Sequence, residues 1–183
     1  MAKTHPEIEP RLQDFIARQS MFFVATAAPT GRINLSPKGL DTLRVLGPRR
    51  VIWLNLTGSG NETAAHLCES DRMTLMFCAF DGEPKILRLY GHARVVHPRD
   101  PDWRRLSELF PAQPGARQVI DLDVDRVQTS CGFGVPLFTL DGNRELLAQW
   151  SERKIANGLE DYWSRKNAVS IDGKPTGITG DIT

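Results

Sequence analysis

A glycine-containing stretch, NLTGSGNETAAHL at residues 55–67, combines residue types that bind phosphate groups. Its two glycines, separated by one residue, let the backbone approach a ligand closely. An asparagine and a threonine follow, and both can donate side-chain hydrogen bonds to the same point. A predicted helix begins here, and the first N–H groups of a helix attract anions. The candidate phosphate ligands are Thr57, Gly58, Gly60, Asn61 and Thr63.

The same stretch does not complete a dinucleotide-binding fingerprint. That fingerprint needs a third glycine, and Thr63 stands at its position. An alternative is that Ser59 and Glu62, which have the S-x-x-E spacing of a capping box, simply cap the helix. The Glu62 carboxylate would also repel an anion. Spacing alone leaves the ligand-binding and the capping interpretations open.

A second candidate segment, NLSPKGL at residues 34–40, could supply a cation. Its polar side chains alternate along a predicted strand end, so they lie on one side of the strand. Its lysine could neutralise a phosphate group, although surface lysines are most often solvated. Helix-end amides and a cation together would suit a phosphorylated cofactor. The candidate ligands in this segment are Asn34, Ser36 and Lys38.

The other residues with reactive or charged side chains say less about the function. Arg88 lies within an apolar strand, so it either faces solvent or pairs with an anion. Cys131 has the chemistry of a nucleophile, but a lone cysteine is usually a buried packing residue. The four histidines show no metal-ligand spacing, so we expect no metal site. No side chain stands out as a general acid or base, and the catalytic residues stay unassigned.

The composition excludes several classes of partner. With 23 basic and 22 acidic residues the net charge is +1, which gives no strong field to attract nucleic acid. No apolar run is long enough to span a bilayer, so we expect no membrane insertion. Three cysteines without a CxxC pair indicate a reducing compartment, and we expect a cytoplasmic protein. The expected partner is a small molecule.

Hydrophobic periodicity predicts the elements that must position these residues. Helices are expected at residues 8–16, after residue 61, at 101–110 and at 144–166. Between them the strands follow one another as hairpins, which favours an antiparallel barrel with helical additions over a parallel α/β fold. The chain is expected to form one domain, with the barrel core at about 20–130. The predicted strands are 21–27, 33–37, 51–57, 72–80, 85–96 and 117–129.

This order of strands and loops resembles the FMN-binding split barrels of the pyridoxamine 5′-phosphate oxidase-like superfamily. The resemblance covers about residues 10–130 and includes GRINLSPKG and VIWLNLTGSGNETAAHL. The motifs LMFCAF, LRLYG and VQTSCGFGVP, and the tail segment NAVSIDG, are similar to one bacterial subfamily.

The resemblance implies a mainly β fold with peripheral helices, built on a six-stranded antiparallel split β-barrel. It also implies a homodimer with FMN at the subunit interface. The flavin would lie along the strand around Ser36 and Lys38, and its phosphate near the helix that begins at Asn61. On this basis the cofactor-binding residues are Asn34, Ser36, Lys38, Thr57, Gly58, Gly60, Asn61, Thr63 and Arg88.

The chain departs from the pyridoxamine phosphate oxidases proper in two places. Those enzymes have Arg and Lys in the phosphate loop, where this chain has Glu62 and Thr63. Lys38, Arg44 or Arg88 must then supply the cation, or neutral donors alone hold the phosphate. The substrate-binding arginine and histidine of the oxidases have no match near the C-terminus, so we do not expect that reaction.

Three functions are left open at this point. The first is an FMN-dependent oxidoreductase that acts on a small organic molecule, with a deazaflavin in place of FMN as a close variant. The second is a flavin- or haem-binding protein that senses, stores or scavenges. The third is a barrel without a cofactor. Residues 129–138 and the aromatic residues of the last helix either wall the pocket or simply pack; those residues are Trp150, Tyr162 and Trp163.

Overall fold

The computed structural model describes residues 2–156 and 158–180, which form eight strands and five helices. The strands are β1 (Lys3–His5), β2 (Phe22–Thr26), β3 (Asn34–Lys38), β4 (Leu43–Gly47), β5 (Arg50–Leu56), β6 (Arg72–Cys78), β7 (Ile86–Val96) and β8 (Ala116–Ser130). The helices are α1 (Pro10–Ala17), α2 (Glu62–Glu69), α3 (Trp103–Ser107), α4 (Leu146–Ile155) and α5 (Leu159–Lys166).

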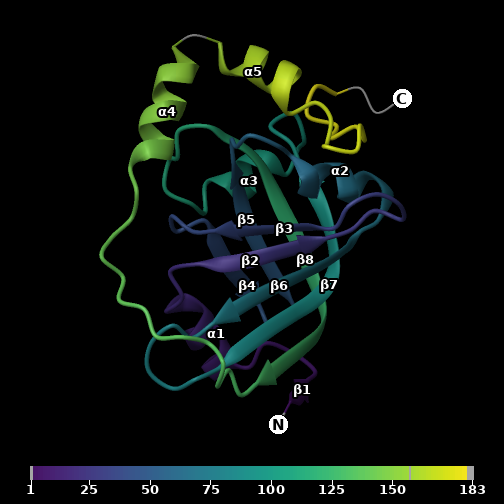
Figure 1. Cartoon of the computed structure of the whole chain (residues 1–183). Helices are drawn as coiled ribbons and strands as arrows, with labels where there is room; N and C mark the ends of the chain where they lie inside the picture. The colour runs from purple at the N-terminus through teal and green to yellow at the C-terminus, as the bar shows by residue number, and fades with distance from the viewer. Residues whose placement is uncertain (1, 157, 181–183) are drawn as a thin grey trace.

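All eight strands belong to one antiparallel sheet with the order β3-β2-β6-β7-β8-β5-β4, and β1 pairs with β8. The sheet curls around an interior (Figure 1) that buried apolar side chains fill. This confirms the predicted mainly β, antiparallel split-barrel fold with peripheral helices. The six predicted strands are all present, as β2, β3, β5, β6, β7 and β8. The sequence did not predict β1 and β4, because three and five residues carry too little periodicity.

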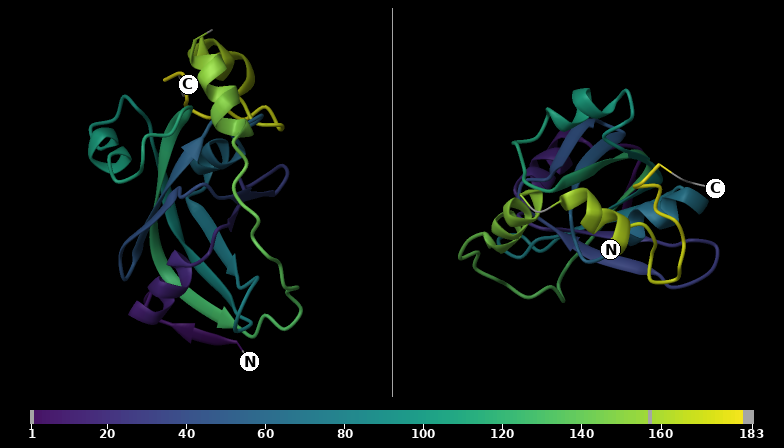
Figure 2. Two further views of the ribbon diagram at one scale, coloured as in Figure 1. Left: turned by 90° about the vertical axis from the view of Figure 1, so that its left-hand side faces the viewer. Right: turned by 90° about the horizontal axis from the view of Figure 1, so that it is seen from above.

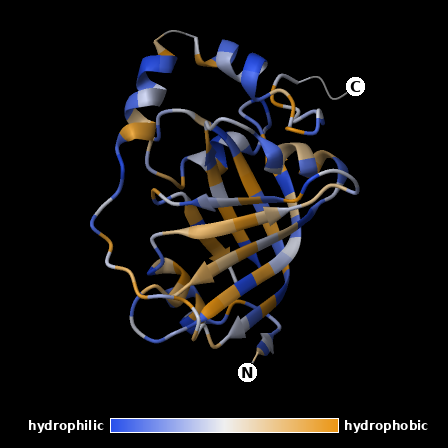
Figure 3. Cartoon of the chain, viewed as in Figure 1, coloured by the Kyte–Doolittle hydropathy of each residue, from blue (hydrophilic) through white to orange (hydrophobic). Residues whose placement is uncertain are grey.

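The barrel interior follows from the alternation of side chains along the strands (Figure 3). On β7, Leu87 and Leu89 are fully buried, whereas Arg88 between them is half-buried on the other face. Burying one such leucine stabilises the fold by about 1.5–3 kcal/mol. Helix α1 adds three buried residues, Leu12, Phe15 and Ile16, to the same core.

The two ends of the barrel are covered by different parts of the chain. Helix α1 and β1 lie at one end, and α4 and α5 lie at the other (Figure 2). The prediction of a single helix over 144–166 is wrong, since the segment forms two helices. Gly158, directly before α5, has φ +89°, a left-handed conformation that ends helical geometry. The two helices contact each other through Trp150 and Tyr162, whose ring centroids are 4.9 Å apart.

Helix α2 has eight residues. The capping-box alternative does not describe its start. The N-cap residue is Asn61 rather than Ser59, and no side chain accepts a hydrogen bond from the first turn. Within the described residues, no helix is both long and apolar enough to cross a membrane.

Candidate functional site

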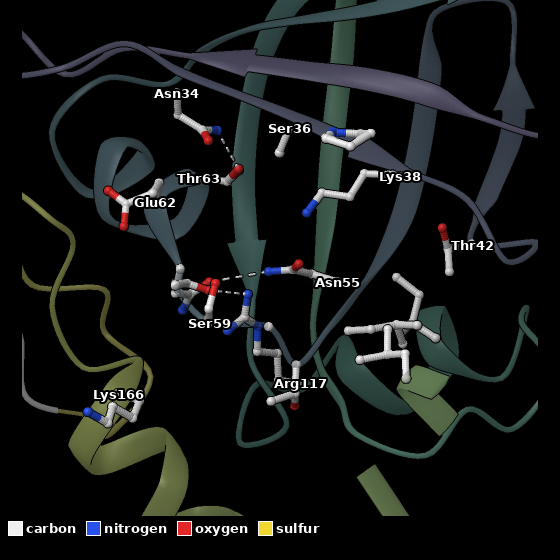
Figure 4. A pocket seen from close by; sticks show the side chains of 18 of the residues that line it. Asn34, Ser36, Lys38, Thr42, Asn55, Ser59, Glu62, Thr63, Arg117 and Lys166 are labelled. Atoms are coloured by element: carbon white, nitrogen blue, oxygen red, sulfur yellow. Dashed lines mark hydrogen bonds between the residues drawn. The ribbon is translucent and has the colours of Figure 1, made fainter. Parts of the chain in front are cut away.

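A cavity of about 840 Å³ lies between β3, β5, the N-terminus of α2 and the C-terminal segment (Figure 4). Its volume is in the range of pockets that hold small molecules and cofactors. Side chains from regions far apart in the sequence line it: the strand β3, the end of β5 with the loop before α2, the start of β8, and the segment that follows α5. The cavity therefore lies where the two candidate segments of the sequence meet.

Eight of the nine predicted cofactor-binding residues line this cavity, namely Asn34, Ser36, Lys38, Thr57, Gly58, Gly60, Asn61 and Thr63. The ninth, Arg88, does not. Its Nη1 donates a hydrogen bond to Ser130 Oγ at 3.2 Å, on a different part of the sheet. Arg44 is also elsewhere, bound to Asp41 through its guanidinium group.

Lys38 supplies the first cation of the cavity. Its side chain is half-buried, and its ammonium nitrogen lies 5.1 Å from the centroid of the Trp53 ring. Burial, and then the nearby charge of Arg117, lowers the pKa of Lys38 from 10.5 to about 8. Among the residues that the structure describes, no carboxylate forms an ion pair with Lys38. Lys38 is therefore a cation without an acidic partner of its own.

Arg117, at the start of β8, is the second cation, and the sequence analysis missed it. Its side chain is buried, with 3% exposed. Nη1 donates to Asn167 Oδ1 at 2.7 Å, and Nη2 donates to the Gly60 carbonyl oxygen at 2.9 Å. Nε has no hydrogen-bond partner, and burial lowers the pKa of Arg117 to about 10. No acidic residue in the described part of the chain pairs with it, and such a buried charge favours an anionic ligand.

The N-terminus of α2 opens into the same cavity. The first N–H groups of a helix have no intrahelical partner, and here no side chain caps them. The buried Asn61 Nδ2 is also without a hydrogen-bond partner. Glu62 does not block this end, because its carboxylate accepts hydrogen bonds from the Ile171 N–H at 3.1 and 3.2 Å. The helix end therefore offers several free donors to one ligand.

Hydrogen bonds between neighbouring elements hold the loop and β3 together. Asn34 Nδ2 donates to Thr63 Oγ1 at 3.2 Å and to Thr26 Oγ1 at 3.1 Å. Asn55 Nδ2 donates to Asn61 Oδ1 at 3.3 Å, which turns the Asn61 amide so that its own Nδ2 stays free. These bonds fix the donors before any ligand arrives.

The hydroxyl group of Thr57 supports the glycine loop and is not free to bind a ligand. Its Oγ1 donates to the Gly115 carbonyl oxygen at 2.7 Å and accepts a hydrogen bond from Trp163 Nε1 at 2.9 Å. The aromatic residues of the C-terminal helices thus brace the loop from behind. Leu147, Lys166 and residues 169–171 form the wall of the cavity on this side.

Cys131 lies outside the cavity, at the end of β8. The interpretation of Cys131 as a buried packing residue is wrong, because it is exposed. A hydrogen bond from the Phe133 backbone N–H lowers the pKa of its thiol. The segment around Cys131 does not wall the cavity either, and runs along the outside of the barrel toward α4 (Figure 1).

The residues that line the cavity restrict the chemistry it can perform. No imidazole, thiol or thioether is among the lining residues in the described part of the chain, so the cavity offers none of the usual haem ligands. The free donors are Lys38 Nζ, Arg117 Nε, Asn61 Nδ2 and the helix N–H groups, all of which suit a phosphate group.

The fold and the cavity define an antiparallel split-barrel protein with a cationic pocket at one end of the barrel. Residues 8–131 match the family described as pyridoxamine 5′-phosphate oxidase. The chain is also 40% identical, over 189 aligned positions, to the pyridoxamine 5′-phosphate oxidase family protein ustO of Aspergillus flavus, in a match that covers 93% of this chain and 76% of that protein. The chain therefore belongs to the pyridoxamine 5′-phosphate oxidase family, as the resemblance of its motifs indicated.

Solved structures with low sequence identity share the fold. A variant of HupZ from Group A Streptococcus is 19% identical, with a TM-score of 0.53, and the match covers 67% of this chain and 99% of that chain. A putative pyridoxamine 5′-phosphate oxidase from Lactobacillus delbrueckii is 16% identical, with a TM-score of 0.52, over 67% of this chain and 94% of that chain. At this identity the similarity concerns the fold alone.

Proposed function

We propose that this protein binds FMN in the cavity and acts as a flavin-dependent oxidoreductase on a small organic molecule. The observation that carries the proposal is that Lys38 and Arg117 line one cavity and neither has an acidic partner. Burying unpaired charge is costly, and a bound phosphomonoester would offset that cost. Membership of the pyridoxamine 5′-phosphate oxidase family is consistent with this ligand.

Each cavity residue has a distinct task under this proposal. Lys38, the guanidinium group of Arg117 and the donors at Asn61 hold the phosphate. Asn34 and Ser36, on β3, contact the flavin further along the cavity. The bound flavin would supply hydride or electron transfer, which no side chain of the cavity can supply alone. The protein binds and orients the cofactor.

The proposal does not extend to the oxidation of pyridoxamine phosphate. Glu62 and Thr63 stand where those oxidases carry Arg and Lys. In this chain Arg117, which lies on β8 and not in the loop, supplies the positive charge for the phosphate. A deazaflavin is the alternative cofactor, and the mass of the bound ligand distinguishes it from FMN.

We also propose that the protein is a homodimer with the cofactor at the subunit interface. The support is the outer side of β3 and the residue before it, where Leu35 and Ile33 are 65% and 78% exposed, next in sequence to Asn34 and Ser36 of the cavity. Large apolar side chains left exposed in a cluster are typical of an interaction surface.

The experiment that tests the proposed function is the identification of the small molecule that copurifies with the protein. We expect a yellow preparation that releases FMN on denaturation, identified by mass spectrometry. Bleaching of the flavin by NADH or NADPH, followed by reoxidation in air, would support an oxidoreductase. A flavin that stays oxidised would indicate storage or sensing instead. A preparation that neither contains a flavin nor takes one up would overturn the proposal.

A further inference from the structure

The segment that follows α5 begins with Asn167, the first residue of the tail motif NAVSIDG, and it lies outside residues 8–131. Asn167 is fully buried. Its Oδ1 accepts the 2.7 Å hydrogen bond from Arg117 Nη1, and its Nδ2 donates to the Gly58 carbonyl oxygen at 3.1 Å. One amide group therefore connects the buried cation to the glycine loop.

We infer that Asn167 is a positioning residue that holds Arg117 and the glycine loop in the geometry that binds the phosphate of the cofactor. This inference rests on the proposed function and extends it to a part of the chain outside the family match. Arg117 carries two anchoring bonds, one to Asn167 and one to Gly60, so that Nε is the nitrogen left for a ligand.

The choice of an amide at position 167 has an electrostatic reason. A carboxylate would bind the guanidinium group more strongly, but it would cancel the positive charge that an anionic ligand needs. The neutral amide orients the guanidinium group and leaves its charge uncompensated. The same position also supplies a donor for Gly58, which a carboxylate could not do.

The tail itself is fastened, so Asn167 can act as a fixed support. Thr176 Oγ1 donates to the Asn167 carbonyl oxygen at 2.6 Å. Further along the tail, Lys174 Nζ lies 2.8 Å from the Glu69 carboxylate on α2, and Asp172 pairs with Arg32 at the turn before β3. These contacts tie the tail to both elements that build the phosphate end of the cavity.

The test compares FMN with riboflavin, which differ by the phosphate group. For the wild-type protein, Asn167→Ala, Asn167→Asp and Thr176→Val, the dissociation constants of both flavins are measured by fluorescence titration. We expect Asn167→Ala to weaken FMN binding about tenfold and riboflavin binding less than twofold. Asn167→Asp keeps a buried acceptor for Arg117 but loses the donor to Gly58. It should weaken FMN binding further through its charge and weaken riboflavin binding no more than Asn167→Ala does.

Thr176→Val tests the support of Asn167, because it removes the hydrogen bond to the Asn167 carbonyl oxygen without touching Arg117. We expect it to lower the melting temperature and to weaken FMN binding more than riboflavin binding, by a smaller factor than Asn167→Ala. Equal effects of Asn167→Ala on FMN and riboflavin, or no effect on either, would overturn the inference and leave the proposed function standing. A wild-type protein that binds neither flavin would overturn the proposed function, and with it this inference. If Asn167→Ala does not fold, Asn167→Ser, which shortens the side chain without adding a charge, is measured in its place and judged by the same comparison of its effects on FMN and riboflavin binding.

Discussion

Arg117 on β8 donates a hydrogen bond from Nη2 to the carbonyl oxygen of Gly60, at 2.9 Å, across 57 positions of the sequence. This contact places a buried guanidinium group beside the glycine loop that precedes α2. The loop is the phosphate-binding candidate of the sequence, but it has no cation of its own. Under the proposed function, Arg117 would supply the positive charge that the loop itself lacks.

Replacing Arg117 with methionine should weaken FMN binding by about tenfold to hundredfold, since hydrogen bonds to charged groups contribute about 1.5–3 kcal/mol. The unfolding free energy of the ligand-free protein should change little, because removal of a buried charge without an acidic partner offsets the loss of the hydrogen bonds to Asn167 and Gly60. Titration with FMN and chemical denaturation measure the two effects. Arg49→Met is the control, because Arg49 also donates to a backbone carbonyl, that of Val124, but lies outside the cavity.

Binding of FMN should weaken as the pH rises through about 8, because Lys38 loses its proton there in the free protein. Below that pH Lys38 is charged and ready to bind phosphate, whereas above it binding must first take up a proton. The dissociation constant should rise by up to about tenfold per pH unit above the pKa. The Lys38→Met variant should bind FMN more weakly, and its dissociation constant should no longer rise with pH in this range. If the dissociation constant of Lys38→Met rises with pH as steeply as that of the wild type, a group other than Lys38 causes the pH dependence.

The same lowered pKa affects the stability of the ligand-free protein. The unfolded chain holds the Lys38 proton up to its ordinary pKa of 10.5, whereas the folded chain releases it at about 8. Between these values the unfolded state binds more protons, so the contribution of Lys38 to unfolding free energy should rise with pH. Urea denaturation of the wild type and of Lys38→Met at several pH values measures the difference between them.

Asn61→Asp should separate cofactor binding from helix stability. Aspartate is a favourable N-cap residue, so the melting temperature should be retained or should rise. The added negative charge faces the phosphate end of the cavity, so FMN binding should weaken about tenfold or more. The same change at the exposed Asn143 is the control. Undiminished FMN binding by Asn61→Asp would place the phosphate away from α2.

Leu35→Arg should test the dimer, because Leu35 is exposed on the outer side of β3. We expect a monomer by light scattering, together with a loss of bound FMN. Leu109→Arg, at a residue that is 44% exposed near α3, should leave the oligomeric state unchanged. A Leu35→Arg protein that remains dimeric would exclude β3 from the interface.

The fold could be predicted from the sequence because each strand and turn is marked by a pattern within its own few residues. Alternating apolar residues mark the long strands, and turns such as Asp81-Gly82 join neighbouring strands into hairpins. The signals failed where elements are short, as in β1 and β4. They also failed near Gly158, where a continuous polar pattern is divided between two helices, α4 and α5.

The candidate site could be predicted only in part, because half of it depends on contacts between distant segments. Asn34, Lys38 and Asn61 were found from their spacing within two short segments. Arg117 and Asn167 were not, since nothing local distinguishes Arg117 from any polar residue at the start of a strand. The S-x-x-E spacing left Ser59 as an alternative cap, but the helix begins at Glu62 and its N-cap residue is Asn61.

A crystal structure of the protein with FMN tests the central claim most directly. We expect the phosphate group within hydrogen-bond distance of Lys38 Nζ, Arg117 Nε and Asn61 Nδ2, and the ring system extending along β3. A phosphate bound elsewhere, or a cavity filled by side chains of a second subunit, would contradict the account.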